Sequence, residues 1–209
     1  MPCSTPIAHN KTAALSRVLD SIPKGYCRWT GGKVKPEKAI ALAQKLHQRY
    51  GIGATPAQRL TRKKRGIANA VLVLYWPPDA EEVDWLMLVT SGSGFETEKL
   101  IDVAVKPRLT WLGYELVRHA LRGKTSWTWR RPKAEMAELF ALYDHHANRH
   151  QTQQLHDLLV RAAHQPGFHG VRSQTRSLIE HALRRGYVGE VPPLFFVQKL
   201  SHGTRIHLT

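Results

Sequence analysis

Apolar side chains recur at helical spacing in the first third of the chain, which predicts helices there. Residues 11–25 carry such a stripe and end at a proline and a glycine. Residues 36–50 repeat the pattern, with Pro36 suited to a first helical turn and Gly51 to a stop. Thr55 before a proline is a good start for a third, short helix.

The middle of the chain changes to short β-rich runs. Residues 67–76 and 83–90 are two apolar runs, separated by a short acidic connection, which we expect to pair antiparallel. A second hairpin is predicted over residues 107–131, with its turn near Gly123.

The last third reads mostly as helix. Pro132 opens a predicted helix, two more are expected over residues 151–165 and 173–186, and a last strand over residues 192–202. The sequence therefore predicts an α+β domain. We expect a mostly antiparallel sheet with helices packed on one face and a helical segment inserted before the last strand. A single domain over residues 1–209 is expected, in which residues 132–186 could form a helical subdomain.

Size and composition favour a globular protein of the cytoplasm. The chain has 209 residues, of which 42% are hydrophobic. Cys3 and Cys27 make neither a disulfide framework nor a zinc cluster, and a reduced compartment fits them. No apolar run is long enough to span a bilayer, and no basic region followed by an apolar stretch begins the chain. We therefore expect a cytoplasmic protein and no membrane partner.

The charge of the chain indicates its class of partner. The formal net charge is +15. The positive charges of so compact a domain repel one another, and a bound polyanion, most commonly nucleic acid, relieves that repulsion. Acids are missing from Lys38 to Pro78 and again from Leu116 to Ala134, whereas cations accumulate in both stretches. This segregation predicts an electropositive face. A patch that merely keeps the protein in solution, or a face that binds an anionic membrane surface, would show the same segregation.

Clustered cations supply the candidate phosphate contacts. Such clusters hold phosphates without reading base sequence. The candidates are Arg59, Arg62, Lys63, Lys64, Arg65, Arg118, Arg122, Lys124, Arg130, Arg131, Lys133 and Arg172.

Two tryptophans lie in the second arm of the predicted hairpin. On an extended strand Trp127 and Trp129 point to the same face. They either stack on unpaired bases, at roughly 1–3 kcal/mol per base, or pack beneath helices as core residues. The pattern alone leaves both interpretations open.

Gly123-Lys124-Thr125 imitates part of a phosphate-binding loop. Arg118 occupies the position where that loop needs its first glycine, and a strand follows where a helix is required. The similarity is therefore an accident of a hairpin turn, and no nucleotide cofactor is expected.

The histidines favour acid–base chemistry over a metal site. His146 and His150 lie one helical turn apart, but the metalloprotease glutamate is missing, so we expect a polar helix face and no metal. Cleavage of RNA without metal needs only a proton donor and acceptor with cations for the phosphate. His119, His169 and His202 are the candidates for that reaction.

Several segments resemble basic proteins carried on proteobacterial plasmids and integrating conjugative elements. They are "RYGIGATPAQRLTRKKRGIANAVLVLYWP", "WLGYELVRH", "SWTWRRPKAEM" and "FFVQKLSHG". The resemblance implies a mobile-element setting, in plasmid maintenance, transfer or RNA-guided defence, and it carries over no catalytic residue. The end of the chain, "PPLFFVQKLSHGTRIHLT", resembles the closing strands of Cas6-type CRISPR RNA-processing proteins, without the glycine-rich loop of that family.

The resulting expectation is a nucleic-acid-binding protein of a mobile genetic element. It would bind DNA or RNA, single-stranded in preference, and a non-enzymatic role is favoured over catalysis. One alternative is a metal-independent endoribonuclease of the CRISPR type. The other is a non-enzymatic subunit of a larger nucleoprotein assembly.

Overall fold

A computed structural model describes residues 3–121, 123–195 and 205–208. The chain divides into two compact units, unit 1 (Met1–Arg108 with Leu200–Thr209) and unit 2 (Leu109–Lys199). Helices and open sheets occur together, so the expected α+β class is confirmed. None of the described helices combines the length and the apolar character needed to cross a membrane.

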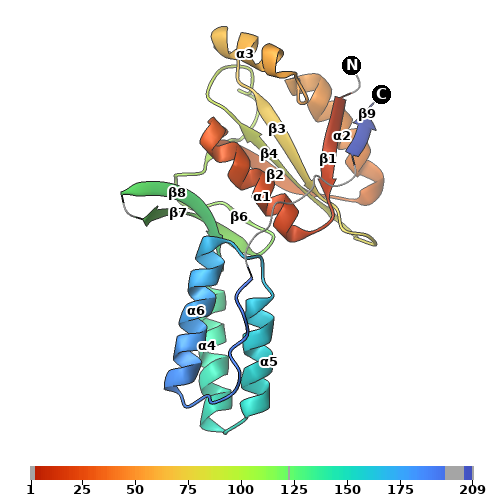
Figure 1. Cartoon of the computed structure of the whole chain (residues 1–209). Helices are drawn as coiled ribbons and strands as arrows, with labels where there is room; N and C mark the ends of the chain where they lie inside the picture. Colours follow the sequence, from red (N-terminus) through yellow and green to blue (C-terminus); the bar gives the residue numbers. More distant parts are fainter. Residues whose placement is uncertain (1–2, 122, 196–204, 209) are drawn as a thin grey trace. The chain divides into compact units, whose positions relative to one another are not determined.

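Unit 1 is built on a mixed sheet (Figure 1). All neighbouring strands in it are antiparallel except β1 and β3, which are parallel. In spatial order the strands are β5 (Ile101–Asp102), β2 (Arg28–Val34), β4 (Val83–Val89), β3 (Ala70–Tyr75), β1 (Cys3–Ala8) and β9 (Arg205–Leu208). The expected hairpin of β3 and β4 is confirmed.

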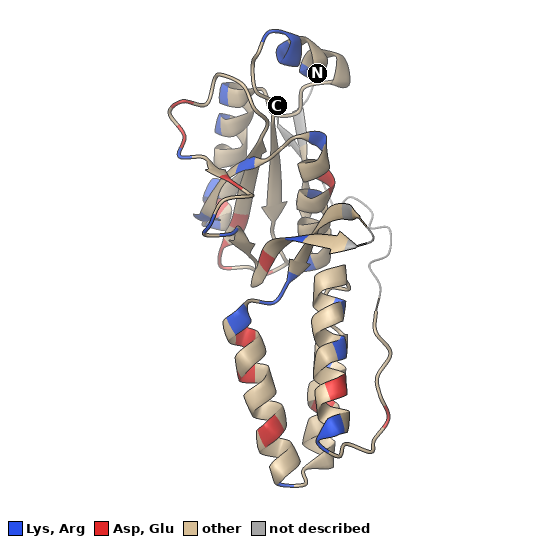
Figure 2. Cartoon of the chain, turned by 90° about the vertical axis from the view of Figure 1, so that its left-hand side faces the viewer, with Lys and Arg blue, Asp and Glu red and all other residues tan. Residues whose placement is uncertain are grey.

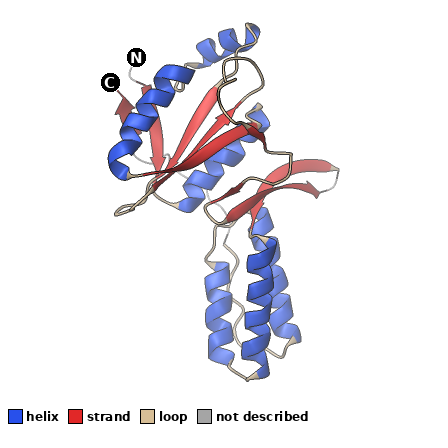
Figure 3. Cartoon of the chain, turned by 180° about the vertical axis from the view of Figure 1, so that it is seen from behind, coloured by secondary structure: helices blue, strands red, loops and turns tan. Residues whose placement is uncertain are grey.

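Helices cover both faces of this sheet, where the sequence predicted one face. Leu72 and Leu74 of β3 pack in one core with Ala43 of α2 (Pro36–Tyr50). Val73 between them is also buried and points to the opposite face, on the side of α1 (Lys11–Ser21) (Figures 1 and 3). A strand buried on both faces has no polar side, so its continuous apolar run could not show how many helix layers cover it.

The ends of the helices in unit 1 follow the sequence signals. Pro36 occupies the first turn of α2, and Gly51 ends the helix in the left-handed conformation with φ 63°. A one-turn helix, η1 (Ile22–Lys24), follows α1. The short helix α3 (Pro56–Lys64) begins at Thr55 with a complete capping box, in which Gln58 is the partner.

Unit 2 contains a small antiparallel sheet and three helices. The sheet is β6 (Thr110–Trp111), β7 (Tyr114–Leu121) and β8 (Lys124–Arg130), and the helices are α4 (Lys133–Asn148), α5 (Thr152–Ala163) and α6 (His169–Arg184). The helices share a core around Tyr143, Leu159 and Leu178. The predicted second hairpin is confirmed, and it belongs to the same unit as the helical segment expected over residues 132–186.

Three predictions at the ends of elements need correction. β1 was not foreseen, because its six residues carry no clear alternation. The strand expected over residues 192–202 is absent from residues 192–195 and otherwise lies outside the described residues, while β9 comes later. α6 begins at His169, earlier than expected, because Gly170 is tolerated inside its first turn.

Candidate nucleic-acid interface

Helix α3 is mostly exposed, since none of its residues is buried and only Arg59 and Arg62 are half-buried. Two side-chain hydrogen bonds hold it against the start of β3. The Arg62 guanidinium donates to the carbonyl oxygen of Ala68 at 2.9 Å, and the Asn69 amide donates to the carbonyl oxygen of Arg59 at 3.1 Å. Arg62, expected to bind phosphate, therefore also fastens the helix that carries the other cations.

A cleft of about 650 Å³ lies beside this helix. We call it the α3 cleft. Its lining includes Lys24 from η1 and Arg59 and Lys63 from α3, and none of the described residues that line it is acidic. Leu60, which is 55% exposed, adds an apolar patch. The cleft therefore combines positive charge with a surface on which an uncharged ring could rest.

The remaining cations of the Arg59–Arg65 cluster, Lys64 and Arg65, lie at the end of α3. Lys63, Lys64 and Arg65 are exposed, and within the described residues no ion pair joins them to a carboxylate. Figure 2 shows Lys and Arg at the end of this helix without Asp or Glu beside them, whereas the helices of unit 2 carry both signs. These charges are available to a polyanion.

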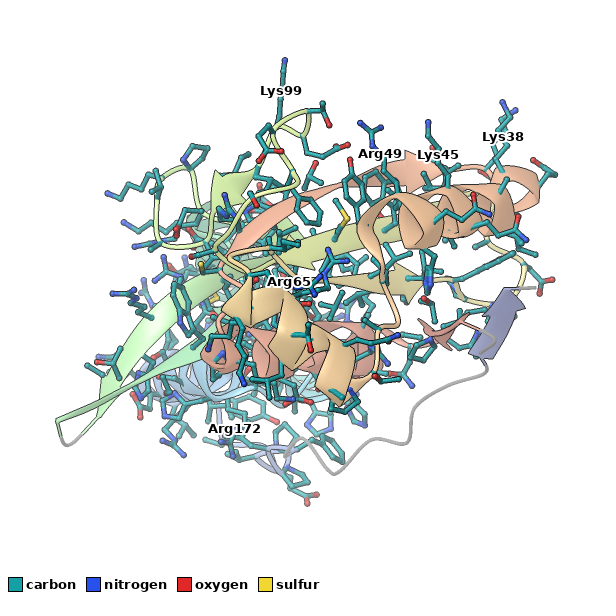
Figure 4. All side chains as sticks on the ribbon, turned by 90° about the horizontal axis from the view of Figure 1, so that it is seen from above. Lys38, Lys45, Arg49, Arg65, Lys99 and Arg172 are labelled. Atoms are coloured by element: carbon teal, nitrogen blue, oxygen red, sulfur yellow. The ribbon has the colours of Figure 1, made fainter. Side chains whose placement is uncertain are left out.

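A second row of cations was not among the predicted site residues. Lys38, Lys45 and Arg49 point outward from α2 on one side, and Lys99 points the same way from the loop after β4 (Figure 4). The acid-free span from Lys38 was the signal that could have identified this row. Glu96 and Glu98 lie in the same loop as Lys99, so this surface is mixed in sign.

The two tryptophans of the hairpin have different environments. Trp129 is fully buried, with Leu116 as its cross-strand neighbour, so it is a core residue and cannot stack on a base. Trp127 is half-buried, and the Arg118 guanidinium lies 5.0 Å from the centroid of its ring. Only the Trp127–Arg118 pair keeps the character of a stacking surface.

The two arginines that follow the tryptophans, Arg130 and Arg131, also differ in burial. Arg131 is 1% exposed, and its guanidinium donates to the carbonyl of Ala162 at 2.9 Å and to the Thr175 hydroxyl at 3.1 Å. Burial lowers the pKa of Arg131. Arg131 therefore joins β8 to α5 and α6, and the expectation that it contacts phosphate is not retained. Arg130 is paired with Glu115 at 2.8 Å, which neutralises much of its charge.

The structure gives less detail for the other predicted cations near the hairpin turn. Lys133 is exposed at the start of α4. Arg122 lies outside the described residues, and the structure describes only the backbone of Lys124. Gly123 has φ 74° in the hairpin turn, which confirms that the apparent phosphate loop is a turn between strands.

Two of the three candidate catalytic histidines lie together in unit 2. The rings of His119 on β7 and His169 on α6 have centroids 3.9 Å apart and planes inclined by 31°. Gly170 lets the start of α6 lie close to β8, because a Cβ atom there would meet the carbonyl oxygen of Trp129 at 2.4 Å. We call His119 and His169 the histidine pair. The third candidate, His202, lies outside the described residues.

Positive charge surrounds the exposed member of the pair. Desolvation, followed by His119, Arg172 and Arg176, lowers the pKa of His169 below its ordinary value. Arg172 is half-buried, and its own pKa is lowered by desolvation and by Arg176. Arg176 was not among the predicted site residues, and its spacing from His169 and Arg172 places it on the same face of α6.

The other histidines form ordinary polar contacts. His146 is hydrogen-bonded to Gln151 at 2.5 Å, and His181 is paired with Asp144 at 2.7 Å. His181 and Arg185 together lower the pKa of Asp144. No group of three metal-ligating side chains occurs within the described parts of the chain.

Comparison with known proteins gives no relative. No family model, no curated protein and no solved structure matches the chain.

Proposed function

We propose that this protein binds nucleic acid, single-stranded in preference, through its phosphate backbone. The α3 cleft is the observation that carries the proposal, since its lining joins Lys24, Arg59 and Lys63 and, within the described part of the chain, includes no acid. Each phosphate neutralised by a cation releases condensed counterions, and this release drives binding. Lys64 and Arg65 extend the positive surface beyond the cleft.

Two features favour a single strand over a duplex. The cleft exposes Leu60 among its cations, which suits the ring of an unpaired base. Unit 2 separately offers Trp127 with the Arg118 guanidinium over its ring. Aromatic side chains beside cations are the usual platform for unpaired bases.

The setting that we propose is the cytoplasm of a cell carrying a mobile genetic element. The resemblance of several segments to basic plasmid proteins supports it, and plasmid maintenance, transfer and RNA-guided defence are the compatible roles. The cleft would serve equally in a protein that acts alone and in one subunit of a nucleoprotein complex.

Replacing the cations of the cleft tests the proposal. The variant Lys24→Gln/Arg59→Gln/Lys63→Gln removes three charges from the lining. The matched control Lys38→Gln/Lys45→Gln/Arg49→Gln removes three from the outer side of α2. Affinity for labelled single-stranded DNA and RNA is measured by fluorescence anisotropy, with the protein freed of co-purifying nucleic acid.

The two variants separate a local site from a general charge effect. The cleft variant should bind more weakly than the control, and its salt slope should fall by about 2–3, close to one unit for each lost phosphate contact. Equal losses in both variants would show that charge alone matters and would contradict a site at the cleft. Binding to an acidic polypeptide in place of nucleic acid would instead identify an assembly subunit.

A further inference from the structure

The histidine pair has features that a packing contact between a strand and a helix does not need. His169 is exposed although its ring lies against His119. Two cations, Arg172 and Arg176, follow it on the same face of α6. A hydroxyl group is also near, since Ser126 of β8 is the cross-strand neighbour of His119. The cluster thus contains two titratable rings, two guanidinium groups and a hydroxyl, all within unit 2.

We propose that His119 and His169 are the acid–base pair of a metal-independent ribonuclease site. This inference rests on the proposed function, because the substrate must first bind. It assigns RNA as the substrate class, since the reaction uses the 2′-hydroxyl of the ribose as its nucleophile.

The proton transfers of the cleavage step use only the two histidines and the substrate. Neutral His169 removes the proton of the 2′-hydroxyl, and the 2′-oxygen forms a bond to the adjacent phosphorus. The bond from phosphorus to the 5′-oxygen breaks, and protonated His119 gives its proton to that oxygen. The products are a 2′,3′-cyclic phosphate and a 5′-hydroxyl, and a proton exchange with water returns both histidines to their starting states.

The surroundings assign the two roles. Desolvation and the charges of His119, Arg172 and Arg176 lower the pKa of His169, so it stays neutral at a pH where an ordinary histidine is partly protonated. A neutral imidazole is the form that a base requires. In His119, the Nε2 atom is buried without a hydrogen-bond partner among the described residues, so the proposal assigns the transferred proton to Nδ1.

The cations supply the electrostatic part of the reaction. Negative charge develops on the phosphate oxygens as the phosphorus becomes five-coordinate, and fixed cations stabilise that charge. Arg172 and Arg176 lie on the face of α6 that carries His169, where they could contact the phosphate oxygens. Among the described side chains of the hairpin, the charged groups on the strand face of His119 are Glu115 and Arg130, which neutralise each other at 2.8 Å.

The test measures cleavage and binding on the same samples. A labelled RNA pool of random sequence and the matching DNA pool are incubated with the full chain in EDTA. Wild type, His119→Ala, His169→Ala and the control His145→Ala are compared, the last because His145 is exposed on α4 away from the pair. Anisotropy reports binding, thermal unfolding reports folding, and end-group analysis identifies the products.

The proposal predicts cleavage of RNA, and not of DNA, to 2′,3′-cyclic phosphate ends. Each histidine of the pair should contribute about 100-fold or more to the rate, while the control is unchanged. The rate should fall with acidification only below the ordinary histidine pKa, through the lowered pKa of His169. That profile is measured on wild type, so it remains decisive if a variant fails to fold.

The other outcomes distinguish failure of the ribonuclease site from failure of the proposed function. RNA binding without cleavage by wild type would overturn the ribonuclease site and leave the proposed function intact. Cleavage that survives in both histidine variants would assign the activity elsewhere and also overturn the proposal. Absence of any nucleic-acid binding would overturn the proposed function itself.

Discussion

At the scale of single residues, burial decides which members of an alternating strand can meet a ligand. Strand alternation placed Trp127 and Trp129 on one face correctly, yet only Trp129 is fully buried. The difference depends on tertiary packing, which no local pattern in the strand shows. Arg131 is another case, since nothing in its sequence neighbourhood indicated that its guanidinium would bond Ala162 and Thr175.

The tryptophans give the first prediction. Trp129→Ala should lower the free energy of unfolding by about 3–5 kcal/mol, because it empties a fully packed site. Trp127→Ala should leave stability nearly unchanged and weaken binding to single strands by about 1–3 kcal/mol if one base stacks there. Chemical denaturation and anisotropy measure the two effects. A large loss of stability in Trp127→Ala would show that it too is a core residue.

His47 gives a prediction about pH. It is 5% exposed, is hydrogen-bonded to Thr5, and burial lowers its pKa. The unfolded chain therefore takes up a proton at higher pH than the folded one. Stability should be full above the ordinary histidine pKa and should decrease as pH falls from there toward the lowered value.

Denaturation at several pH values measures this linkage. His47→Gln should show a flatter dependence of stability on pH in that window, while His145→Ala, at an exposed position, should keep the wild-type dependence. An unchanged profile in His47→Gln would assign the acid sensitivity to another group.

At the scale of elements, the sequence predicted best what caps and turns decide. Pro36, Gly51 and Thr55 marked helix ends that the structure bears out, and the hairpin turn fell at Gly123. Pairing between distant segments was less visible. The parallel pair of β1 with β3 and the antiparallel pair of β1 with β9 depend on contacts far apart in sequence, which local periodicity cannot encode.

The cap of α3 gives a prediction at this scale. Because α3 buries no residue, its stability depends on its capping box and two side-chain anchors. Thr55→Ala should cost the helix about 1 kcal/mol and should weaken binding without changing the charge.

Thr61→Ala is the matched control. It removes the same atoms as Thr55→Ala. The Thr61 hydroxyl donates to the Ala57 carbonyl within the helix at 3.1 Å, so it does not cap the helix. Hydrogen exchange of the α3 amides and anisotropy measure both variants. If Thr55→Ala frays the helix while binding is unaffected, the order of α3 is irrelevant to the interface.

At the scale of the whole chain, net charge indicated the class of partner and the fold determined which cations are free to meet it. Of the predicted cations, Arg131 is buried, Arg130 is paired and Arg62 anchors α3. Sequence analysis could not separate these from Lys63 to Arg65, because all of them sit in acid-free stretches. Lys24, which joins the cleft from η1, was missed for the opposite reason, since it stands alone in the sequence.

The salt dependence of binding tests the central claim most directly. Affinity of wild-type protein for a labelled single strand is measured across a series of salt concentrations in EDTA. If the three cations of the α3 cleft contact phosphates, the logarithm of the binding constant should fall by about 2 or more for each tenfold rise in salt, at about 0.7 per contact. A flat response would contradict binding through the phosphate backbone.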